Sequence, residues 1–319
     1  MSKLPSKKAN HSSKIAIVGA GFVGSTAAYA CMIDGAVSEI ALIDVNREKA
    51  EGEAMDLQHG IPFKPNVKVT FGNDYSLCKG ADIVVICAGA HQKPGETRLD
   101  LVNKNATMFK QMIPSITKYN KNCILLVVSN PLDVLTYLAL KYSKFSKNRV
   151  FGSGTILDTS RFRYLLSRHF GVSPNSVHAY ILGEHGDSSF PVWSTANIAG
   201  VPLKNFREYN KKKMDNIYLK TKNAAYEVIS RKGATYYAIG LGVAKIVRSI
   251  LSDQNEVFAL SSYLNNYQGV SGICLSVPTI VNRNGVKKQI KLPLNSLEKK
   301  QLRKSANVIN GILRGCMNC

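Results

Sequence analysis

The sequence of 319 residues is short of acidic side chains. It has 21 Asp and Glu against 42 Lys and Arg, which gives a formal net charge of +21 at pH 7 and a pI of about 9.7. Such an excess attracts anionic surfaces, so a nucleic-acid or other anion-binding protein is one hypothesis. Aromatic residues are sparse around the lysine clusters at 211–213, 287–288 and 299–304, which leaves no stacking surface for a single strand. Nucleic acid is therefore not expected as the principal partner.

Long apolar runs are also missing. No stretch reaches the roughly 18 uninterrupted apolar residues that a membrane-spanning helix requires, so no membrane partner is expected. The lysines near the N-terminus precede an apolar run that is broken by glycines, and this pattern does not suit a secretory signal peptide. Residues 1–13 are predicted to be a disordered basic tail, and the expected location is the cytoplasm.

The sequence lacks a paired set of cysteines. Its seven cysteines are odd in number and lie mostly inside apolar runs, which is typical of reduced thiols rather than a disulfide framework. Cys316 and Cys319 form a Cys-x-x-Cys pair without a partner pair or a nearby His. A metal or redox site and a frayed C-terminal end are the alternatives, and the frayed end is favoured. No metal site is expected elsewhere.

A glycine-rich segment follows the first apolar run. Gly19, Gly21 and Gly24 have the spacing G-x-G-x-x-G after the apolar residues 15–18. Strand, tight turn and helix in this order place unpaired helix N–H groups against a pyrophosphate. Asp44 ends the next apolar run, where a carboxylate binds a ribose hydroxyl and repels the extra phosphate of NADP, so the predicted cofactor is NAD. The expected contacts of this segment are Gly19, Gly21, Phe22, Val23 and Gly24.

Apolar strand-like and periodic helix-like segments alternate up to about residue 150. This alternation predicts an α/β protein with a doubly wound, parallel Rossmann-type sheet. Longer helices and strand pairs follow, including a hairpin turn at Asn284 and Gly285 and a helix capped by Asn295 and Glu298. The second half is thus predicted to be a mixed α+β catalytic domain. The predicted units are the tail (1–13), an NAD-binding domain (14–152) and a substrate domain (153–319).

His185 is the leading candidate for catalysis. It lies in the run Gly-Glu-His-Gly-Asp, and Asp158 stands upstream, three residues before Arg161. A 2-oxo acid that accepts a hydride needs a proton donor at its carbonyl, an anion that holds this donor, and a cation for its carboxylate. An Asp bonded to one imidazole nitrogen fixes the tautomer and raises the pKa of the His. An Arg binds a carboxylate through two parallel hydrogen bonds.

Each of these residues also has a simpler interpretation. Asp158 opens a periodic run to Phe170 and suits a helix N-cap. A single His is more often an ordinary bonded residue, and Arg161 suits a solvated helix charge. Because the three stand together downstream of a cofactor motif, the catalytic interpretation is favoured, and a pure anion binder has no use for such a set.

These motifs together resemble the L-lactate dehydrogenases, most closely their bacterial branch, from residue 14 to about 313. The resemblance extends to the segments 88–98, 129–131, 152–163 and 183–187. It implies reversible hydride transfer between NADH and pyruvate to give L-lactate, the final step of fermentative glycolysis, and a homotetramer. A dehydrogenase for bulkier 2-oxo acids stays open as an alternative, because the volume of a pocket is not visible in a sequence.

The resemblance assigns roles to individual residues. It implies that His185 is the proton donor and Asp158 its orienting carboxylate. Arg161 would bind the substrate carboxylate with help from the Thr235 hydroxyl. Asn130 would bond near the nicotinamide ribose and the reacting carbonyl. The nicotinamide ring would pack against Ile239.

Residues 90–98 resemble the mobile lid of this family. Lid closure would expel water and bring Arg98 over the carbonyl, where it stabilises developing negative charge. Gln92 stands where malate dehydrogenases carry an Arg for the second carboxylate of oxaloacetate. An unpaired carboxylate in a closed, dry site costs several kcal/mol in order-of-magnitude terms, so pyruvate and lactate are favoured.

Two further residues bear on regulation. Arg163 and His178 fall where allosteric bacterial lactate dehydrogenases bind fructose 1,6-bisphosphate across a subunit interface. A cation pair of this kind suits a bisphosphate. Ordinary interface or surface positions are the alternative for both residues.

Overall fold

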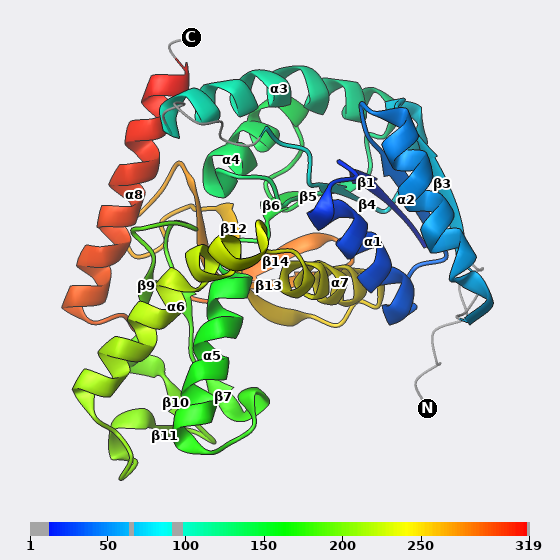
Figure 1. Ribbon diagram of the computed structural model, residues 1–319. Coiled ribbons are helices and arrows are strands. Elements are labelled where there is room, and N and C mark those ends of the chain that lie inside the picture. The colour runs from blue at the N-terminus through cyan, green and yellow to red at the C-terminus, as the bar shows by residue number, and fades with distance from the viewer. Residues whose placement is uncertain (1–12, 64–66, 91–97, 318–319) are drawn as a thin grey trace, which may run out of the picture.

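The computed structural model describes residues 13–63, 67–90 and 98–317. Nine strands of this part of the chain form one sheet, in the order β14-β13-β12-β6-β5-β4-β1-β2-β3 (Figure 1). Of the tail predicted for residues 1–13, only Ser13 is described, and its carbonyl accepts hydrogen bonds from the backbone N–H groups of Ser38 and Glu39. The strands are β1 Lys14–Val18, β2 Glu39–Ile43, β3 Lys68–Gly72, β4 Ile83–Ile86, β5 Ile124–Val127, β6 Val150–Gly152, β12 Glu256–Tyr263, β13 Cys274–Asn282 and β14 Gly285–Gln289.

The six strands from β3 to β6 are all parallel. Their order, β3-β2-β1-β4-β5-β6, is that of a doubly wound sheet in which the chain starts in the middle and builds outward on each side. Both faces of such a sheet are covered, which explains why all four residues of β4 and of β5 are buried and apolar. The doubly wound fold class predicted from the sequence is confirmed.

The remaining strands of this sheet are antiparallel. β12 pairs with β6 through Ser261 and Gly152, and β13 and β14 continue the sheet outward. The predicted hairpin turn lies one residue earlier than expected, because Asn282 pairs with Gly285 and leaves Arg283 and Asn284 as the two turn residues. β14 therefore begins at Gly285, a residue that the sequence pattern places in the turn.

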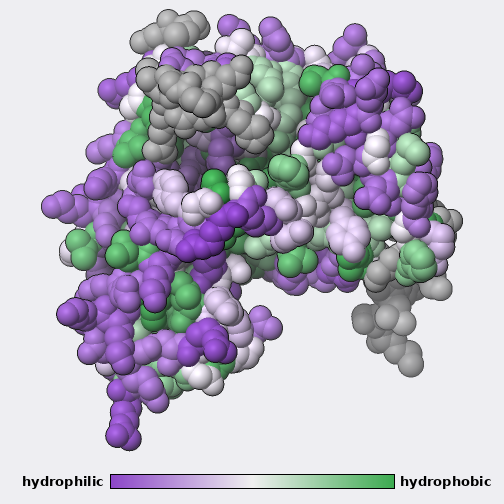
Figure 2. Space-filling model, in the orientation of Figure 1, coloured by the Kyte–Doolittle hydropathy of each residue, from purple (hydrophilic) through white to green (hydrophobic). Residues whose placement is uncertain are grey.

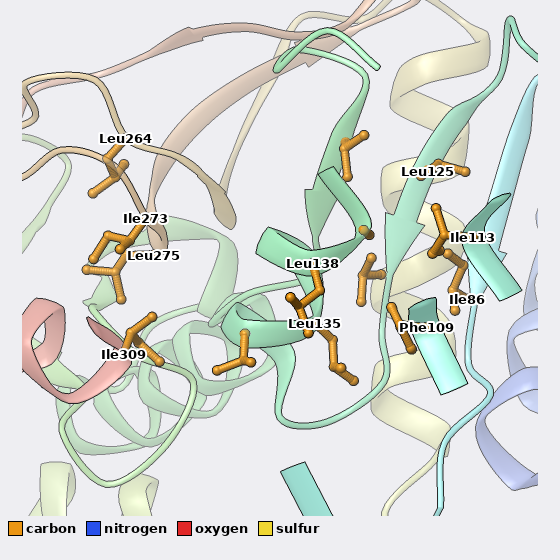
Figure 3. Close-up of a cluster of buried hydrophobic side chains, with 14 of the residues drawn as sticks. Ile86, Phe109, Ile113, Leu125, Leu135, Leu138, Leu264, Ile273, Leu275 and Ile309 are labelled. Atoms are coloured by element: carbon orange, nitrogen blue, oxygen red, sulfur yellow. The ribbon is translucent and has the colours of Figure 1, made fainter. Parts of the chain in front are cut away.

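Two hydrophobic cores lie on opposite faces of the sheet. Along β4 the side chains alternate, so that Ile83 and Val85 join one core while Val84 and Ile86 join the other. The first core is completed by helices α1, α2 and α7, and the second by α3, α4 and α8. Figure 3 shows the second core, with strand, helix and loop residues converging: Ile86, Leu125, Phe109, Ile113, Leu135, Leu138, Leu264, Ile273, Leu275 and Ile309.

The eight α-helices of the described residues agree closely with the periodic segments of the sequence. Some of their ends differ from the periodic segments by three or four residues: α7 begins at Tyr237, where the pattern predicts a start near residue 234, and α8 ends at Met317, where the pattern predicts an end near Leu313. The capping box predicted at Asn295 is present. The Asn295 side chain accepts from the Glu298 N–H at 2.9 Å, and the Glu298 carboxylate accepts from the Asn295 N–H at 2.9 Å. The helices are α1 Phe22–Asp34, α2 Arg47–His59, α3 Arg98–Tyr119, α4 Leu132–Ser143, α5 Ile156–Phe170, α6 Lys211–Lys232, α7 Tyr237–Leu251 and α8 Ser296–Met317.

A smaller lobe projects from the main sheet around helices α5 and α6 (Figure 1). It has its own apolar cluster, in which Phe162 and Met214 are fully buried. Short strands complete it: β7 Val177–His178, β10 Asn197–Ile198 and β11 Val201–Pro202 form one sheet, and β8 Ile181–Leu182 pairs with β9 Phe190–Pro191.

Hydrophilic side chains cover most of the face shown in Figure 2 and leave only small apolar groups between them. In the part of the chain that the structure describes, every helix is too short or too polar to cross a bilayer.

Candidate active site

The glycine-rich turn joins β1 to α1 with very little space between their backbones. Gly19 has a φ of +100°, and a Cβ there would lie 2.5 Å from the backbone nitrogen of Ala88. A Cβ on Gly24 would lie 1.8 Å from the carbonyl oxygen of Gly19. A side chain at either position would force the helix away from the sheet, so these two glycines set how closely α1 approaches the ends of β1 and β4.

Gly21, the middle glycine of the motif, is only partly buried and lies where the pyrophosphate of NAD is expected. Gly21 is the N-cap of α1, and a Cβ there would meet only the Lys49 ammonium, 4.0 Å away. Helix geometry leaves the first N–H groups of α1 without partners inside the helix, which favours an anion at this point. Asp44 follows β2, and its carboxylate already accepts from the Ala20 N–H at 2.7 Å and the Asn46 N–H at 3.0 Å. The cradle therefore suits a dinucleotide.

The predicted cofactor contacts at Phe22 and Val23 differ in exposure. Phe22 is 69% exposed and stacks on Tyr236 with ring centroids 5.2 Å apart. Val23 is half-buried and packs against the core formed with α7. The stacking of Phe22 on Tyr236 was not predicted, because the two residues are far apart in the sequence.

His185 lies in the loop between β8 and β9. The loop is fixed to the sheet by Gly183, which exchanges two backbone hydrogen bonds with Ser276 of β13 at 3.1 and 3.0 Å. The His185 Nδ1 atom lies 2.7 Å from the Asp158 Oδ2 atom, and Arg161 donates from Nη1 to the Asp158 Oδ1 atom at 3.2 Å. The structure thus brings together the three residues that the sequence singled out.

The N-cap interpretation of Asp158 is wrong. The cap of α5 is Thr155, and Asp158 lies inside the first turn of the helix. One turn of helix separates Asp158 from Arg161, which places both side chains on the same side of α5 and leaves Asp158 between the imidazole and the guanidinium.

The contacts of this trio change the acidity of two groups. Burial lowers the pKa of His185, but the charge and hydrogen bond of Asp158 outweigh burial, and the net pKa lies above its usual value. Burial raises the pKa of Asp158, but His185 and then Arg161 outweigh it, and the net pKa lies below its usual value. Asp158 is therefore ionised, and His185 carries a proton more readily than a free imidazole.

A cavity of about 480 Å³ opens beside His185. His185, Asp158 and Asn130 all line it. Because Nδ1 of His185 is bonded to Asp158, the other ring nitrogen, Nε2, is left for a molecule in the cavity. Its other walls come from the start of α3 and α4, the loop before β9, and one side of α6: Leu101, Val102, Pro131, Ile181, Gly186, Asp187, Ser189, Tyr218, Thr221, Lys222, Ala225, Tyr226 and Ile229.

Other predicted site residues are not among those that line this cavity. Arg161 contacts Asp158, which does line it, and Arg98 begins α3, one turn before Leu101. Thr235 lies between α6 and α7, and Ile239 packs against the core on α7. Gln92 falls outside the described residues.

Asp133 is a further residue of this site, and the sequence motifs did not predict it. Its Oδ2 atom accepts from the His185 backbone N–H at 2.7 Å, and its Oδ1 atom accepts from the Ser261 hydroxyl at 2.6 Å. A signal was present, because Asp133 is the one charged residue in the mostly apolar run from Leu132 to Ala139.

Two sequence models match nearly the whole chain. The lactate/malate dehydrogenase NAD binding domain matches residues 13–152, and the lactate/malate dehydrogenase alpha/beta C-terminal domain matches residues 155–315. The chain belongs to the lactate/malate dehydrogenase family. The family resemblance and the NAD cofactor predicted from the sequence are thereby confirmed.

Relatives within this family are similar over almost their full length. The chain is 52% identical to an L-lactate dehydrogenase of Acetivibrio thermocellus over 306 residues, which covers 94% of this chain and 96% of the relative. It is 53% identical to L-lactate dehydrogenase 1 of Clostridium acetobutylicum over 301 residues, 93% of this chain and 96% of the relative. A crystal structure of the minor L-lactate dehydrogenase of Enterococcus mundtii, in a ligand-bound form, superposes with a TM-score of 0.93 at 43% identity, covering 96% and 98% of the two chains.

The residues predicted to bind an effector of this dehydrogenase family lie beside the short strand β7. Arg163 donates from Nε to the carbonyl oxygen of Ala179 at 2.9 Å, and its guanidinium lies over the Tyr180 ring at 4.9 Å from the centroid. His178, the preceding strand residue, is exposed. Arg163 also lines a separate cavity of about 370 Å³.

Across residues 13–63, 67–90 and 98–317, no group of three or more His, Cys, Asp or Glu side chains could hold a metal ion. Cys316 packs partly buried against the core near α8, and its partner Cys319 falls outside the described residues.

Proposed function

We propose that the protein is an NAD-dependent L-lactate dehydrogenase that interconverts pyruvate and L-lactate. The observation that carries the proposal is the 2.7 Å contact between His185 and Asp158 beside a cavity that Asn130 shares. The relatives named L-lactate dehydrogenase support the same activity at about half identity over nearly the whole chain.

The proposed chemistry follows from the protonation of His185. Bound NADH supplies the hydride for C2 of pyruvate. Protonated His185 donates from Nε2 to the carbonyl oxygen, and Asp158 holds the Nδ1 proton in place throughout. In the reverse direction, neutral His185 takes the proton from the hydroxyl of lactate, so the same pair serves both directions.

Cationic and polar groups orient the substrate in this proposal. Arg161 binds the carboxylate of pyruvate, with the hydroxyl of Thr235 as a further donor. Arg98 stabilises the charge that develops on the carbonyl oxygen, and Asn130 bonds near that oxygen. The contact between Arg161 and Asp158 reduces the freedom of the guanidinium before substrate binds, which lowers the entropic cost of orienting the acid.

A panel of 2-oxo acids tests this proposal. Steady-state rates with NADH on pyruvate, 2-oxoisocaproate, phenylpyruvate and oxaloacetate should be highest, as kcat/KM, on pyruvate. A higher kcat/KM on the branched or aromatic acids would favour the alternative, a dehydrogenase of bulkier substrates. Persistence of turnover as ionic strength rises separates catalysis from nonspecific attachment of the basic surface to anions.

Substrate choice is proposed to depend on Gln92. Replacement of Gln92 by Arg should raise kcat/KM for oxaloacetate relative to pyruvate by about 100-fold or more, because the second carboxylate gains a charged partner in a dry site. Both kcat/KM values are measured at one pH and one NADH concentration. Lys93→Arg is the matched control, since it keeps the charge beside Gln92, and unchanged relative rates in Gln92→Arg would remove the residue from substrate selection.

Assembly and regulation belong to the same proposal. We propose a cytoplasmic homotetramer in which Arg163 and His178 bind the phosphates of fructose 1,6-bisphosphate. Fructose 1,6-bisphosphate should lower the KM for pyruvate severalfold in the wild type and have little effect on Arg163→Gln, while light scattering reports the mass of both. Equal activation of the two proteins would assign the effector to other residues.

A further inference from the structure

Asp133 is a buried carboxylate whose two hydrogen-bond donors are a backbone N–H and a hydroxyl. It is 2% exposed and lies in the first turn of α4, where the helix N-terminus favours negative charge. Within the described parts of the chain, no Lys or Arg forms an ion pair with it. Burial of a carboxylate costs free energy unless hydrogen bonds compensate for the lost hydration. The role of Asp133 therefore depends on the two groups that donate hydrogen bonds to it.

Those two groups join the loop between β8 and β9, called the catalytic loop below because it carries His185, to the main sheet. One is the backbone N–H of His185, 2.7 Å from Oδ2, and the other is the hydroxyl of Ser261, 2.6 Å from Oδ1. Ser261 is fully buried on β12, at the position that pairs with Gly152 of β6. Asp133 therefore ties the main chain of His185 to strand β12 of the main sheet.

His185 is consequently held from two sides by two carboxylates. Asp158 binds its ring at Nδ1, and Asp133 binds its backbone N–H. The backbone bond limits translation of the residue, whereas the ring bond limits rotation of the imidazole. A displacement of about 1 Å in a catalytic group can cost about 100-fold in rate, so both restraints matter.

We propose that Asp133 is a positioning residue for the reaction proposed above: it fixes the main chain of His185, and its negative charge favours the imidazolium form of that residue. The inference rests on the proposed function for its kinetic consequences. It does not rest on it for the protonation of His185, which is a property of the protein without substrate.

The charged and titratable groups around Asp133 come from three elements. His185 and Glu184 belong to the catalytic loop, Cys274 to β13, and Asp158 with Arg161 to α5 beyond the imidazole. Burial raises the pKa of Asp133 to about 6, although the bonds from Ser261 and His185 lower it. Asp133 contributes in turn to the raised pKa of His185.

The sign of the pH effect follows from these charges. Pyruvate reduction needs protonated His185, so acid does not inhibit it through that residue. Protonation of Asp133 adds a carboxyl hydrogen beside the two hydrogens that the carboxylate already accepts. The hydrogen bond from the His185 backbone N–H is weakened as a result. An acid limb near pH 6 in pyruvate reduction is therefore assigned to Asp133, and the alkaline limb to His185.

Asp133→Asn tests this assignment with little change of shape. The amide oxygen can accept from the His185 N–H while the amide nitrogen donates to Ser261, so the fold is retained. In Asp133→Asn the acid limb of kcat/KM should disappear, and the alkaline limb should move to lower pH by roughly 0.5–1 unit because a negative charge near the imidazole is lost.

Two further variants act on the same bonds. Asp133→Ala leaves the His185 N–H unpaired and should lower kcat by about 10- to 100-fold while the Kd for NADH stays unchanged. Ser261→Ala removes a hydrogen bond that stabilises the ionised Asp133, so the acid limb should move to higher pH. Circular dichroism and thermal unfolding report whether each variant is folded.

Glu298→Gln is the matched control. Glu298 is also a carboxylate that is 2% exposed, and it accepts from the Asn295 N–H at 2.9 Å and the Ser194 hydroxyl at 2.6 Å. It caps α8 and lies outside the catalytic loop. Both limbs of the pH profile should stay at their wild-type positions in this variant.

A proton NMR titration of His185 separates the two proposals. The pKa of its imidazole should be lower in Asp133→Asn than in the wild type, whether or not pyruvate is turned over. A wild-type protein that does not reduce pyruvate would overturn the proposed function, but it would not overturn the role of Asp133. An unchanged imidazole pKa in Asp133→Asn, or wild-type kcat in Asp133→Ala, would overturn the role of Asp133.

Discussion

Replacement of His185 by Asn should lower kcat for pyruvate reduction by about 100- to 10,000-fold, because the amide cannot donate a proton at neutral pH. The Kd for NADH should stay near its wild-type value, since the glycine-rich cradle and Asp44 lie on other elements. Stopped-flow turnover gives kcat, and the quenching of protein fluorescence on NADH binding gives the Kd. Loss of activity without loss of binding is the expected signature of a missing proton donor.

The pH dependence of the two directions adds a second check on His185. Because the net pKa of His185 lies above its usual value, pyruvate reduction should continue through neutral pH, and its alkaline limb should lie above the usual pKa of an imidazole. Lactate oxidation needs the neutral imidazole and should rise over the same interval. The control is His59→Asn, which changes an exposed His at the end of α2 and should leave both profiles unmoved. Retained turnover in His185→Asn would transfer the proton donor to another residue.

Replacement of Arg161 by Leu should lower kcat/KM for pyruvate by about 100-fold or more. The loss follows from leaving a carboxylate unpaired in the site, which costs about 2–5 kcal/mol. Arg161→Lys should recover part of the loss only, because an ammonium keeps the charge but not the two parallel bonds. Steady-state kinetics with pyruvate measure both variants.

Arg161 also acts on its neighbours through charge. Its positive charge lowers the pKa of His185, so Arg161→Leu should move the alkaline limb of the remaining activity to higher pH. Arg168→Leu, an exposed position in the last turn of the same helix, is the matched control. A wild-type KM for pyruvate in Arg161→Leu would show that the substrate carboxylate binds elsewhere.

Most of the fold could be predicted because its signals are local. The glycines of the first turn indicate close contacts that only glycine permits. A Cβ added to Gly19 or to Gly24 would lie within 3 Å of another backbone atom. Apolar runs such as 83–86 are buried on both faces, as a central parallel strand requires. The cap at Asn295 and Glu298 involves two residues that are three positions apart, so sequence spacing was sufficient.

The remaining features depend on contacts between distant segments. Asp133 and Ser261 are 128 positions apart, and nothing in either segment indicates that they share a hydrogen bond. The junction between β6 and β12 likewise joins the two halves of the chain through an antiparallel pair that composition does not encode. The trio of His185, Asp158 and Arg161 is predictable only from its combined chemistry, because each residue taken alone also suits an ordinary structural position.

The shared sheet has a mechanical consequence. Since β12 hydrogen-bonds to β6, the strands that carry the cofactor cradle and those that anchor the catalytic loop are parts of one continuous ladder. Swivelling one half of the molecule against the other would require that ladder to break. The shared sheet therefore fixes the distance between the nucleotide cradle and the imidazole of His185, and no hinge sets it.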